Sequence, residues 1–282
     1  MLLVKKKADL RSYLDQQKQG KHLIGFAPTM GALHQGHISL IETSVKVNSI
    51  TVCSIFVNPT QFNDPRDFEK YPITIENDIR LLESSGCDVL FLPSVAEVYG
   101  ENGTSPQHYD LDYLETILEG KYRPGHFQGV CMVVHRLLEI VRPTSLYLGQ
   151  KDYQQCMVIN KLISLIGQPN IKLVICPTLR EADGLAMSSR NMRLNTEERM
   201  VAPSIYQALQ YIKANLKQGD LTSLKAMAAS RLTQQDFKVD YVEIADAVTL
   251  RSVSEWDGDQ ELVALAAAFL HEVRLIDNLI LS

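Results

Sequence analysis

The stretch GFAPTMGALHQGH, residues 25–37, decides the fold of the first half of the chain. The apolar run His22–Phe26 leads into it and has the pattern of a strand, and the apolar spacing of His37–Val47 is that of a helix. A strand, a glycine-containing turn and a helix start, in this order, open a βαβ unit. Such a turn offers backbone N–H groups and the positive end of a helix dipole to a phosphate group.

The same alternation of strand-like and helical patterns continues to Pro177 and predicts a Rossmann-like, doubly wound parallel sheet. Pro143 ends one of the helical patterns, because proline cannot continue a helix. The predicted strands are His22–Phe26, Ile50–Val57, Cys87–Leu92, Ser145–Leu148 and Ile171–Cys176, and the predicted helices are His37–Val47, Ile75–Ser84, Phe127–Ile140 and Tyr153–Ile166.

The pattern changes after Pro177 and predicts a smaller α+β domain. Helical segments are predicted at Thr196–Lys217 and Leu221–Leu232, followed by strands at Val239–Ile244, Leu262–Leu270 and Val273–Leu281. We therefore expect a catalytic domain over residues 1–177 and a smaller domain over residues 178–282 that closes over the active site. No long linker separates the two, so we expect a cleft between them.

The composition excludes several classes of function. The chain has 282 residues, a formal net charge of -5 and no basic run long enough to bind nucleic acid. Its apolar runs are too short to span a bilayer, and its first residues do not resemble a signal peptide. Five cysteines without a C-x-x-C pair each lie in an apolar stretch, which favours reduced core thiols. We expect a cytoplasmic protein.

His34 and His37 are the first candidate catalytic residues. They stand three positions apart at the start of a helix, and Gly36 between them allows the close approach that a phosphate needs. Two imidazoles there can stabilise the charge of a leaving pyrophosphate. A helix-start turn with a solvent-exposed histidine is the structural alternative. A zinc pair is disfavoured, because zinc needs three or four protein ligands and no cluster of suitable spacing completes the set.

A second polar segment, Met187-Ser188-Ser189-Arg190, lies where the pattern changes. Its two hydroxyls and its guanidinium can donate several hydrogen bonds to ATP phosphates. Together with the first segment, it resembles the H-x-G-H and K-M-S-K-S signatures of the nucleotidylyltransferase superfamily, which includes class I aminoacyl-tRNA synthetases.

Five blocks between and around these segments resemble the pantothenate synthetase family in order and spacing. The family joins pantoate to β-alanine through a pantoyl adenylate and releases AMP and pyrophosphate. The resemblance therefore implies ATP as a substrate, Mg²⁺ as its partner and, by the family's habit, a homodimer. The five blocks are residues 28–37, residues 56–62, residues 123–127, residues 149–155 and residues 180–191.

The resemblance also implies roles for single residues. His37 takes the position of the family's proton donor, and His34 and Lys151 complete the predicted catalytic set. Leu179 is expected to contact adenine through its backbone. The implied ATP-binding residues are Met30, Gly31, Ala32, Leu33, His34, Gln35, Gly36, His37, Gly149, Gln150, Lys151, Asp152, Leu179, Met187, Ser188, Ser189 and Arg190.

Five further residues are predicted to bind pantoate or β-alanine: Gln61, Gln155, Asn58, Arg123 and His126. Gln61 follows a strand, and ligands bind beyond the carboxyl ends of strands in open α/β sheets. Its amide carries donors and acceptors that suit hydroxyls and a carboxylate. A strand-end residue satisfied by the turn backbone is the structural alternative.

The metal ligands are not predicted. Relatives often carry acidic residues after the Tyr71-Pro72 pair, where this chain reads Glu76-Asn77-Asp78, so one expected carboxylate is an amide. Thr60 and Gln150 also differ from the family's more common Leu and Glu.

Two other functions stay open. A related transferase that releases a dinucleotide would share the phosphate motifs but would not need Gln61, Gln155 or the Arg123–Phe127 block. A regulatory ATP-binding module without catalysis would not need the intact set of His37, Lys151 and Ser188-Ser189-Arg190.

Overall fold

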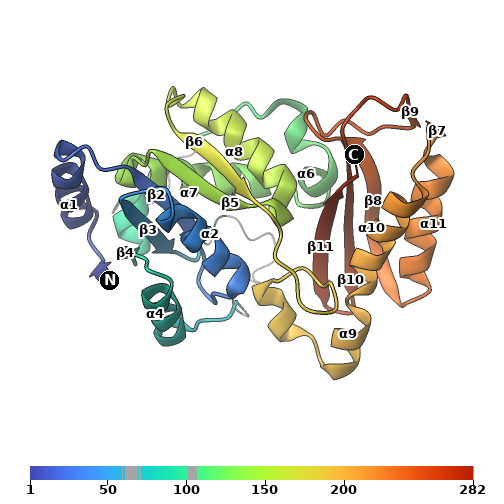
Figure 1. The fold of residues 1–282 in the computed structure, drawn as a ribbon, viewed down its shortest axis with the longest axis horizontal. Coiled ribbons are helices and arrows are strands. Elements are labelled where there is room, and N and C mark those ends of the chain that lie inside the picture. The colour runs from blue at the N-terminus through green and yellow to red at the C-terminus, as the bar shows by residue number, and fades with distance from the viewer. Residues whose placement is uncertain (59, 61–68, 70, 101–106, 282) are drawn as a thin grey trace. The chain divides into compact units, whose positions relative to one another are not determined.

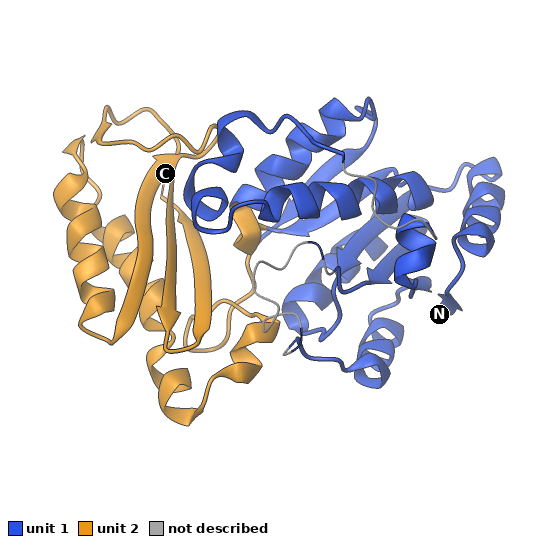
Figure 2. Ribbon diagram, turned by 180° about the vertical axis from the view of Figure 1, so that it is seen from behind, with its two compact units in different colours: residues 1–149, 154–177 blue, residues 150–153, 178–282 orange. Residues whose placement is uncertain are grey.

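The structure is a computed structural model that describes residues 1–58, 60, 69, 71–100 and 107–281. The chain divides into two compact units (Figure 2). The first unit contains residues 1–149 and 154–177, and the second contains residues 150–153 and 178–282.

A parallel sheet forms the centre of the first unit. Among the described residues it has six strands in the order β1-β4-β3-β2-β5-β6, and every neighbouring pair is parallel. The predicted doubly wound parallel sheet is therefore confirmed. The strands are β1 (Leu2–Val4), β2 (Ile24–Thr29), β3 (Ile50–Ile55), β4 (Val89–Phe91), β5 (Ser145–Gly149) and β6 (Lys172–Cys176).

Helices cover both faces of this sheet (Figure 1). Right-handed crossovers place α2 and α4, which contact each other, on one face and the contacting pair α1 and α7 on the other. Under α2 and α4 lies a core that includes Ala27, Leu40, Cys53 and Leu82. The helices are α1 (Lys7–Gln19), α2 (Gln35–Val45), α4 (Ile75–Ser84), α5 (Val95–Tyr99), α6 (Leu118–Tyr122), α7 (His126–Val141) and α8 (Tyr153–Leu165), with 3-10 turns η2 (Asp112–Glu115) and η3 (Gln150–Asp152), the latter in the second unit.

The order of the strands fixes where ligands bind in the first unit. From β2 the chain crosses to β3 on one side, and it later returns to β5 on the other side of β2. Strand β2 therefore borders the topological switch point, where open α/β sheets bind ligands beyond the carboxyl ends of their strands. The turn that follows β2 at these strand ends is residues 30–34, the first part of the predicted ATP segment Met30–His37.

An antiparallel sheet forms the core of the second unit, as the α+β prediction requires. Its strand order is β11-β10-β8, and α10 and α11 pack against it to bury a core that includes Ile205, Leu209, Leu232 and Ala264. Its elements are η4 (Ser189–Arg193), α9 (Thr196–Val201), α10 (Ser204–Asn215), β7 (Gly219–Asp220), α11 (Thr222–Thr233), β8 (Phe237–Asp246), β9 (Glu255–Trp256), β10 (Leu262–Leu270) and β11 (Val273–Ile280).

Three features differ from the sequence-based prediction. The single helix predicted over Thr196–Lys217 is wrong, because Pro203, which lacks a backbone N–H, separates α9 from α10. Strand β1 and helix α1 were not predicted. Helix α1 is mostly polar and buries only Leu10 and Leu14, so its apolar periodicity is weak.

Candidate active site

The turn after β2 is held in a fixed conformation by one buried carboxylate. Asp78, on α4, is fully buried and accepts hydrogen bonds from the backbone N–H of Ala32 at 3.0 Å and of Leu33 at 2.9 Å. Thr74 donates its hydroxyl to the same carboxylate at 2.9 Å. The turn is thus hydrogen-bonded to helix α4.

The backbone of this turn also requires a small residue at position 31. Gly31 has a φ of +84° and Ala32 a φ of +48°, both in the left-handed region that favours glycine. A Cβ on Gly31 would lie 3.0 Å from a methyl group of Ile55 and 3.2 Å from the carboxylate of Asp78. The Asp78 carboxylate can therefore reach the turn only because residue 31 has no side chain.

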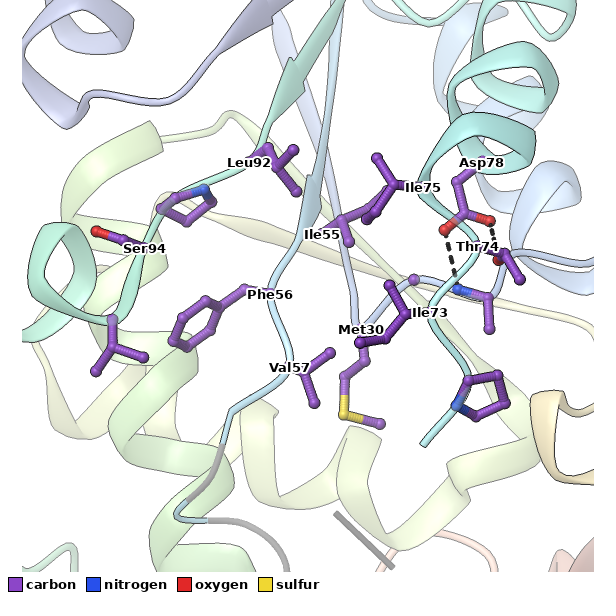
Figure 3. A pocket seen from close by; sticks show the side chains of 15 residues that line it. Met30, Ile55, Phe56, Val57, Ile73, Thr74, Ile75, Asp78, Leu92 and Ser94 are labelled. Atoms are coloured by element: carbon purple, nitrogen blue, oxygen red, sulfur yellow. Dashed lines mark hydrogen bonds between the residues drawn. The ribbon is translucent and has the colours of Figure 1, made fainter. Parts of the chain in front are cut away.

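A pocket of about 280 Å³ opens beside this turn (Figure 3). Apolar side chains such as Met30, Ile55 and Val57 line most of it. Asp78 and Thr74 lie on one side, and Ser94 lies on the other. A small, partly apolar pocket with a few polar groups is the usual form of a ligand site in a globular protein.

His34 and His37 form the cap of helix α2. His34 precedes the helix as its N-cap, so it is not part of the helical turn in which the sequence placed both histidines. The N–H of Gly36 donates to Nδ1 of His34 at 3.2 Å, and the N–H of His34 donates to Nδ1 of His37 at 3.4 Å. A neutral imidazole that accepts at Nδ1 carries its hydrogen on Nε2, so each Nε2–H is the donor that a phosphate oxygen would meet.

The two rings lie close together, with centroids 4.0 Å apart, and both side chains are half-buried. The neighbouring Gln35 is exposed and Gly36 is half-buried. The helix-start turn of the structural alternative is therefore present, although neither histidine is fully exposed to solvent. It is compatible with a phosphate site, because the positive end of the α2 dipole lies at the same place.

Arg123 and His126 are bonded to each other. Arg123 Nη1 lies 3.0 Å from Nε2 of His126, and a guanidinium can only donate, so this imidazole nitrogen accepts. The carboxylate of Glu119 lies 3.6 Å from the same guanidinium. Gly125, with a φ of +78°, makes the sharp turn that begins α7. The pair braces the turn between α6 and α7.

Asn58 is a structural residue at the end of β3. It is fully buried, donates to the Gly129 carbonyl at 3.2 Å and accepts from the Tyr99 hydroxyl at 2.8 Å. These bonds tie the end of β3 to α5 and α7, and its predicted contact with a substrate stays a prediction. Gln61 lies outside the described residues.

Gln155 lies in the first turn of α8 and is half-buried. The residue before it, Gln154, has a structural task that the sequence did not indicate. Its amide accepts from the N–H of Glu119 at 2.9 Å and donates to the carbonyls of Leu114 at 2.8 Å and Ile117 at 3.0 Å. Gln154 thus fastens the segment before α6 to α8.

Residues 150–153 belong to the second unit because of contacts with β11 and with the residue after β8. Asn278 donates to the backbone carbonyls of Gln150 at 2.9 Å and Lys151 at 2.8 Å. The Tyr153 hydroxyl donates to the Ala247 carbonyl at 2.7 Å. The predicted ATP residues Gln150, Lys151 and Asp152 form η3, and the Lys151 ammonium lies 3.7 Å from the Asp152 carboxylate. Gly149 ends β5 in the first unit.

The second predicted phosphate segment, Met187–Arg190, follows a short hairpin. Arg180 and Ala186 form an isolated antiparallel bridge, and the N–H of Met187 donates to the Leu179 carbonyl at 3.0 Å. Ser188 then caps η4 by accepting from the N–H of Arg190 at 3.3 Å, and Ser189 is buried. The segment is therefore an ordered turn that brings two hydroxyls and a guanidinium into neighbouring positions.

A buried ion pair supports this hairpin. Arg180 donates to the two oxygens of Asp277 at 2.6 and 3.0 Å, and its guanidinium lies 3.7 Å from the centre of the Tyr206 ring. Burial raises the pKa of Asp277, and the bonds from Arg180 act in the opposite direction.

The part of the chain that the structure describes contains neither a metal-binding cluster nor a helix that could span a membrane. It contains no group of three or more His, Cys, Asp or Glu side chains that could hold a metal ion. None of its helices has the length and apolar character that crossing a bilayer requires.

Comparisons with known proteins agree with this fold. The family model of pantoate–β-alanine ligase matches residues 2–280. The pantothenate synthetase of Cytophaga hutchinsonii is 47% identical over 276 residues, which is 96% of either chain, and that of Leptospira biflexa is 43% identical over 100% of this chain and 99% of its own.

Two solved structures are similar over nearly the whole chain. The crystal structure of pantothenate synthetase from Thermus thermophilus has a TM-score of 0.91 and 39% identity, with 99% of each chain covered. Pantoate–β-alanine ligase from Francisella tularensis, complexed with β-γ ATP and β-alanine, has a TM-score of 0.82 and 37% identity, covering 99% of this chain and 97% of its own.

The fold and its similarity to solved pantothenate synthetases define an enzyme with a Rossmann-like domain. The chain belongs to the pantoate–β-alanine ligase family. The family and the enzyme class predicted from the five sequence blocks are therefore confirmed.

Proposed function

We propose that this chain condenses pantoate with β-alanine in two steps at the expense of ATP. In the first step the pantoate carboxylate attacks the α-phosphorus of ATP, which forms pantoyl adenylate and releases pyrophosphate. In the second step the amine of β-alanine attacks the acyl carbonyl, which forms pantothenate and releases AMP and a proton. Membership of the family and the anchored turn at the start of α2 support this reaction.

The anchored turn is the single observation that carries the first step. Met30–Leu33 line the ATP site, and the Nε2–H groups of His34 and His37 donate to the phosphates of ATP. They do so at a helix N-terminus, where the dipole favours negative charge. Donors that are already held in place need no reorganisation as charge develops on the leaving pyrophosphate.

Further contacts with ATP are proposed for the other residues that the sequence predicts. Lys151 supplies a positive charge to the phosphates, Asp152 accepts from a ribose hydroxyl, and Leu179 contacts adenine through its backbone. Ser188, Ser189 and Arg190 donate to the phosphates, and a closed segment of this kind excludes water from a hydrolysable acyl adenylate. Gly149 and Gln150 contribute backbone contacts beside Lys151.

The two acid substrates bind through amides and a guanidinium. Gln155, together with Gln61, suits the hydroxyls and the carboxylate of pantoate, because a glutamine amide both donates and accepts. Arg123 guides the carboxylate of β-alanine, and His126 holds the Arg123 guanidinium by accepting at Nε2. Asn58 acts on the substrates indirectly in this proposal, since its hydrogen bond to the Gly129 carbonyl holds the segment after β3 against α7.

Magnesium enters this proposal with the nucleotide. The described residues offer no cluster that could cage the ion, and both oxygens of Asp78 already accept backbone N–H groups. Mg²⁺ is commonly bound through substrate phosphates with few protein ligands, and there it neutralises phosphate charge. We also propose a homodimer in the cytoplasm, which is the common arrangement for a metabolic enzyme of this kind.

The test measures pyrophosphate release from ATP, Mg²⁺ and D-pantoate, with and without β-alanine. Release should require pantoate, and pantothenate and AMP should accumulate only when β-alanine is present. His37→Ala should slow release by roughly 100-fold or more, since general acid–base groups contribute about that factor. His22→Ala is the matched control, because His22 is exposed and bonds only a nearby glutamine, Gln17, at 2.9 Å among the contacts described.

Folded protein that binds ATP but releases no pantoate-dependent pyrophosphate would exclude this reaction. The transferase that releases a dinucleotide would then be tested with phosphate-bearing acceptors, and the non-catalytic ATP-binding module by the absence of turnover with either class of substrate.

A further inference from the structure

Two adjacent polar residues, Asp277 and Asn278, lie between the apolar residues Ile276 and Leu279 of strand β11. Each is buried, with 2% of its surface exposed. A buried polar side chain destabilises a protein unless it is hydrogen-bonded, so such a pair must have partners. Successive side chains of a strand point to opposite faces, and the two residues accordingly have different partners.

Asn278 holds the turn that carries Lys151. Its Nδ2 donates one hydrogen to the Gln150 carbonyl at 2.9 Å and the other to the Lys151 carbonyl at 2.8 Å. Its Oδ1 accepts from the side chain of Gln150 at 3.3 Å. One amide thus bonds two successive carbonyls and fixes the direction in which the Lys151 side chain leaves the backbone.

Asp277 holds the hairpin that leads to Met187–Arg190. It accepts two hydrogen bonds from Arg180, and the same guanidinium donates to the Gly184 carbonyl at 3.1 Å, across the hairpin turn. Arg180 also donates to the backbone carbonyl of Asn278 at 3.2 Å. The segment that follows this hairpin therefore starts from a fixed point on β11.

We propose that Asp277 and Asn278 are positioning residues for ATP, which set the relative position of the Lys151 turn and the Met187–Arg190 segment. This inference deepens the proposed function and rests on it for the ATP roles of those two segments. Neither side chain need touch the nucleotide. A rigid strand that supports both segments keeps their donors at the spacing that the phosphate chain requires.

The first test is Asn278→Asp, which keeps the shape of the side chain but replaces both donor hydrogens with an oxygen. That oxygen would face the carbonyls of Gln150 and Lys151, and the turn must move. We expect weaker ATP binding by calorimetry and slower pantoate-dependent pyrophosphate release, by as much as about 100-fold, the loss that a displacement of roughly 1 Å can cause. Asn278→Leu has a similar shape without charge and should give the same direction of change.

Asp240→Asn is the matched control. Arg274, on the same strand β11, donates to Asp240 at 2.8 Å, and the two side chains are 14% and 12% exposed. The substitution weakens a comparably buried contact of β11 that involves neither ATP segment. It should lower the melting temperature and leave the affinity for ATP unchanged.

A double-mutant cycle separates positioning from general stability. If Asn278 acts through Lys151, Asn278→Asp should weaken ATP binding much less in a Lys151→Ala protein than in the wild type. Equal losses in the two backgrounds, or wild-type ATP affinity in both Asn278 variants, would overturn the inference. Asn278→Leu takes the same place in the cycle if Asn278→Asp does not fold.

A third assay supplies pantoyl adenylate and β-alanine directly. Asn278→Asp should lose less activity there than in pyrophosphate release, because no triphosphate has to be positioned. If the wild type releases no pantoate-dependent pyrophosphate while the cycle in ATP binding is non-additive, the proposed reaction fails and the positioning inference stands. If the wild type is active and the cycle is additive, the reaction stands and the inference fails.

Discussion

Asp78 and Leu33 are 45 residues apart in the sequence, and a hydrogen bond of 2.9 Å joins the Leu33 N–H to the Asp78 carboxylate. Ala32 donates to the other carboxylate oxygen at 3.0 Å. The carboxylate is fully buried, so it is a fixed acceptor and not a surface charge. The geometry of the turn at residues 30–34, for which we propose ATP binding, therefore depends on helix α4, which lies outside the sequence motif of that turn.

Asp78→Asn should weaken both the fold and the binding of ATP. The amide can keep one acceptor, but its NH₂ group then faces a buried backbone N–H, which costs about 1–3 kcal/mol of unfolding free energy. We expect urea unfolding to show this loss and the KM for ATP to rise several-fold while the KM for β-alanine stays constant.

The control for this substitution is Asp88→Asn. Asp88 accepts a hydrogen bond from the Thr51 N–H at 2.8 Å. It directly precedes β4 and therefore lies at the amino ends of the strands, away from the turn after β2. It should lose stability without a change in the KM for ATP. An unchanged KM in Asp78→Asn, or an equal change in Asp88→Asn, would contradict a specific link between Asp78 and the ATP turn.

The cysteines give a prediction about chemical reactivity. All five are free and buried. Burial raises the pKa of Cys87 and of Cys131 to about 12, and it raises the pKa of Cys53 as well. The thiolate is the reactive form, and a thiol of pKa about 12 is ionised at only about one part in ten thousand at pH 8.

We therefore expect that iodoacetamide at pH 8, without a reducing agent, modifies none of the five cysteines of the native protein within the time in which a free thiol reacts. In concentrated urea all five should react. Intact-protein mass spectrometry reads both results. Rapid labelling of the native protein, or fewer than five labels after unfolding, would show an exposed thiol or a disulfide.

The fold was predictable where local pattern and tertiary structure agree. Ile75–Ser84 and Leu262–Leu270 were predicted with the bounds that the structure has, since the first has apolar residues at helical spacing and the second is apolar throughout. Helix α1 could not be predicted, because only Leu10 and Leu14 of its polar sequence are buried. Pro203 is visible in the sequence as a residue that can end a helix, but the apolar periodicity continues on both sides of it and indicates a single helix.

The candidate site divides in the same way. The segments proposed to bind ATP could be named from the sequence because the donors of each are consecutive in the chain. Asp78 and Asn278 were missed because they act on backbone groups that are far away in the chain, 45 residues for Leu33 and 127 for Lys151. The sequence did contain a signal for Asn278, since two adjacent polar residues between apolar residues of a buried strand need hydrogen-bond partners.

Gly31→Ala tests whether the turn needs a glycine for its backbone or for its packing. The left-handed φ of +84° should cost an alanine about 1–2 kcal/mol of unfolding free energy. The new Cβ would in addition crowd Ile55 and Asp78. Gly167→Ala is the control, because its φ is +66° and no atom lies within 4 Å of the added Cβ.

Both alanine variants should lose stability in thermal or urea unfolding, and Gly31→Ala should lose more. Only Gly31→Ala should weaken ATP binding, since Gly167 lies in the turn after α8. Equal losses of stability and equal ATP affinity in the two variants would mean that the packing of the Gly31 turn has no part in binding.

The two roles of His34, as the N-cap of α2 and as a proposed phosphate ligand, can be tested separately. It accepts the Gly36 N–H at 3.2 Å as the N-cap of α2, a position that asparagine also fills well and alanine does not. His34→Ala should therefore lower the unfolding free energy by about 1 kcal/mol, and His34→Asn should restore most of that loss. Neither variant carries an imidazole Nε2–H, so both should slow pantoate-dependent pyrophosphate release to a similar extent. Recovery of release together with stability in His34→Asn would assign His34 to the helix cap alone and leave His37 as the imidazole that acts on the phosphates.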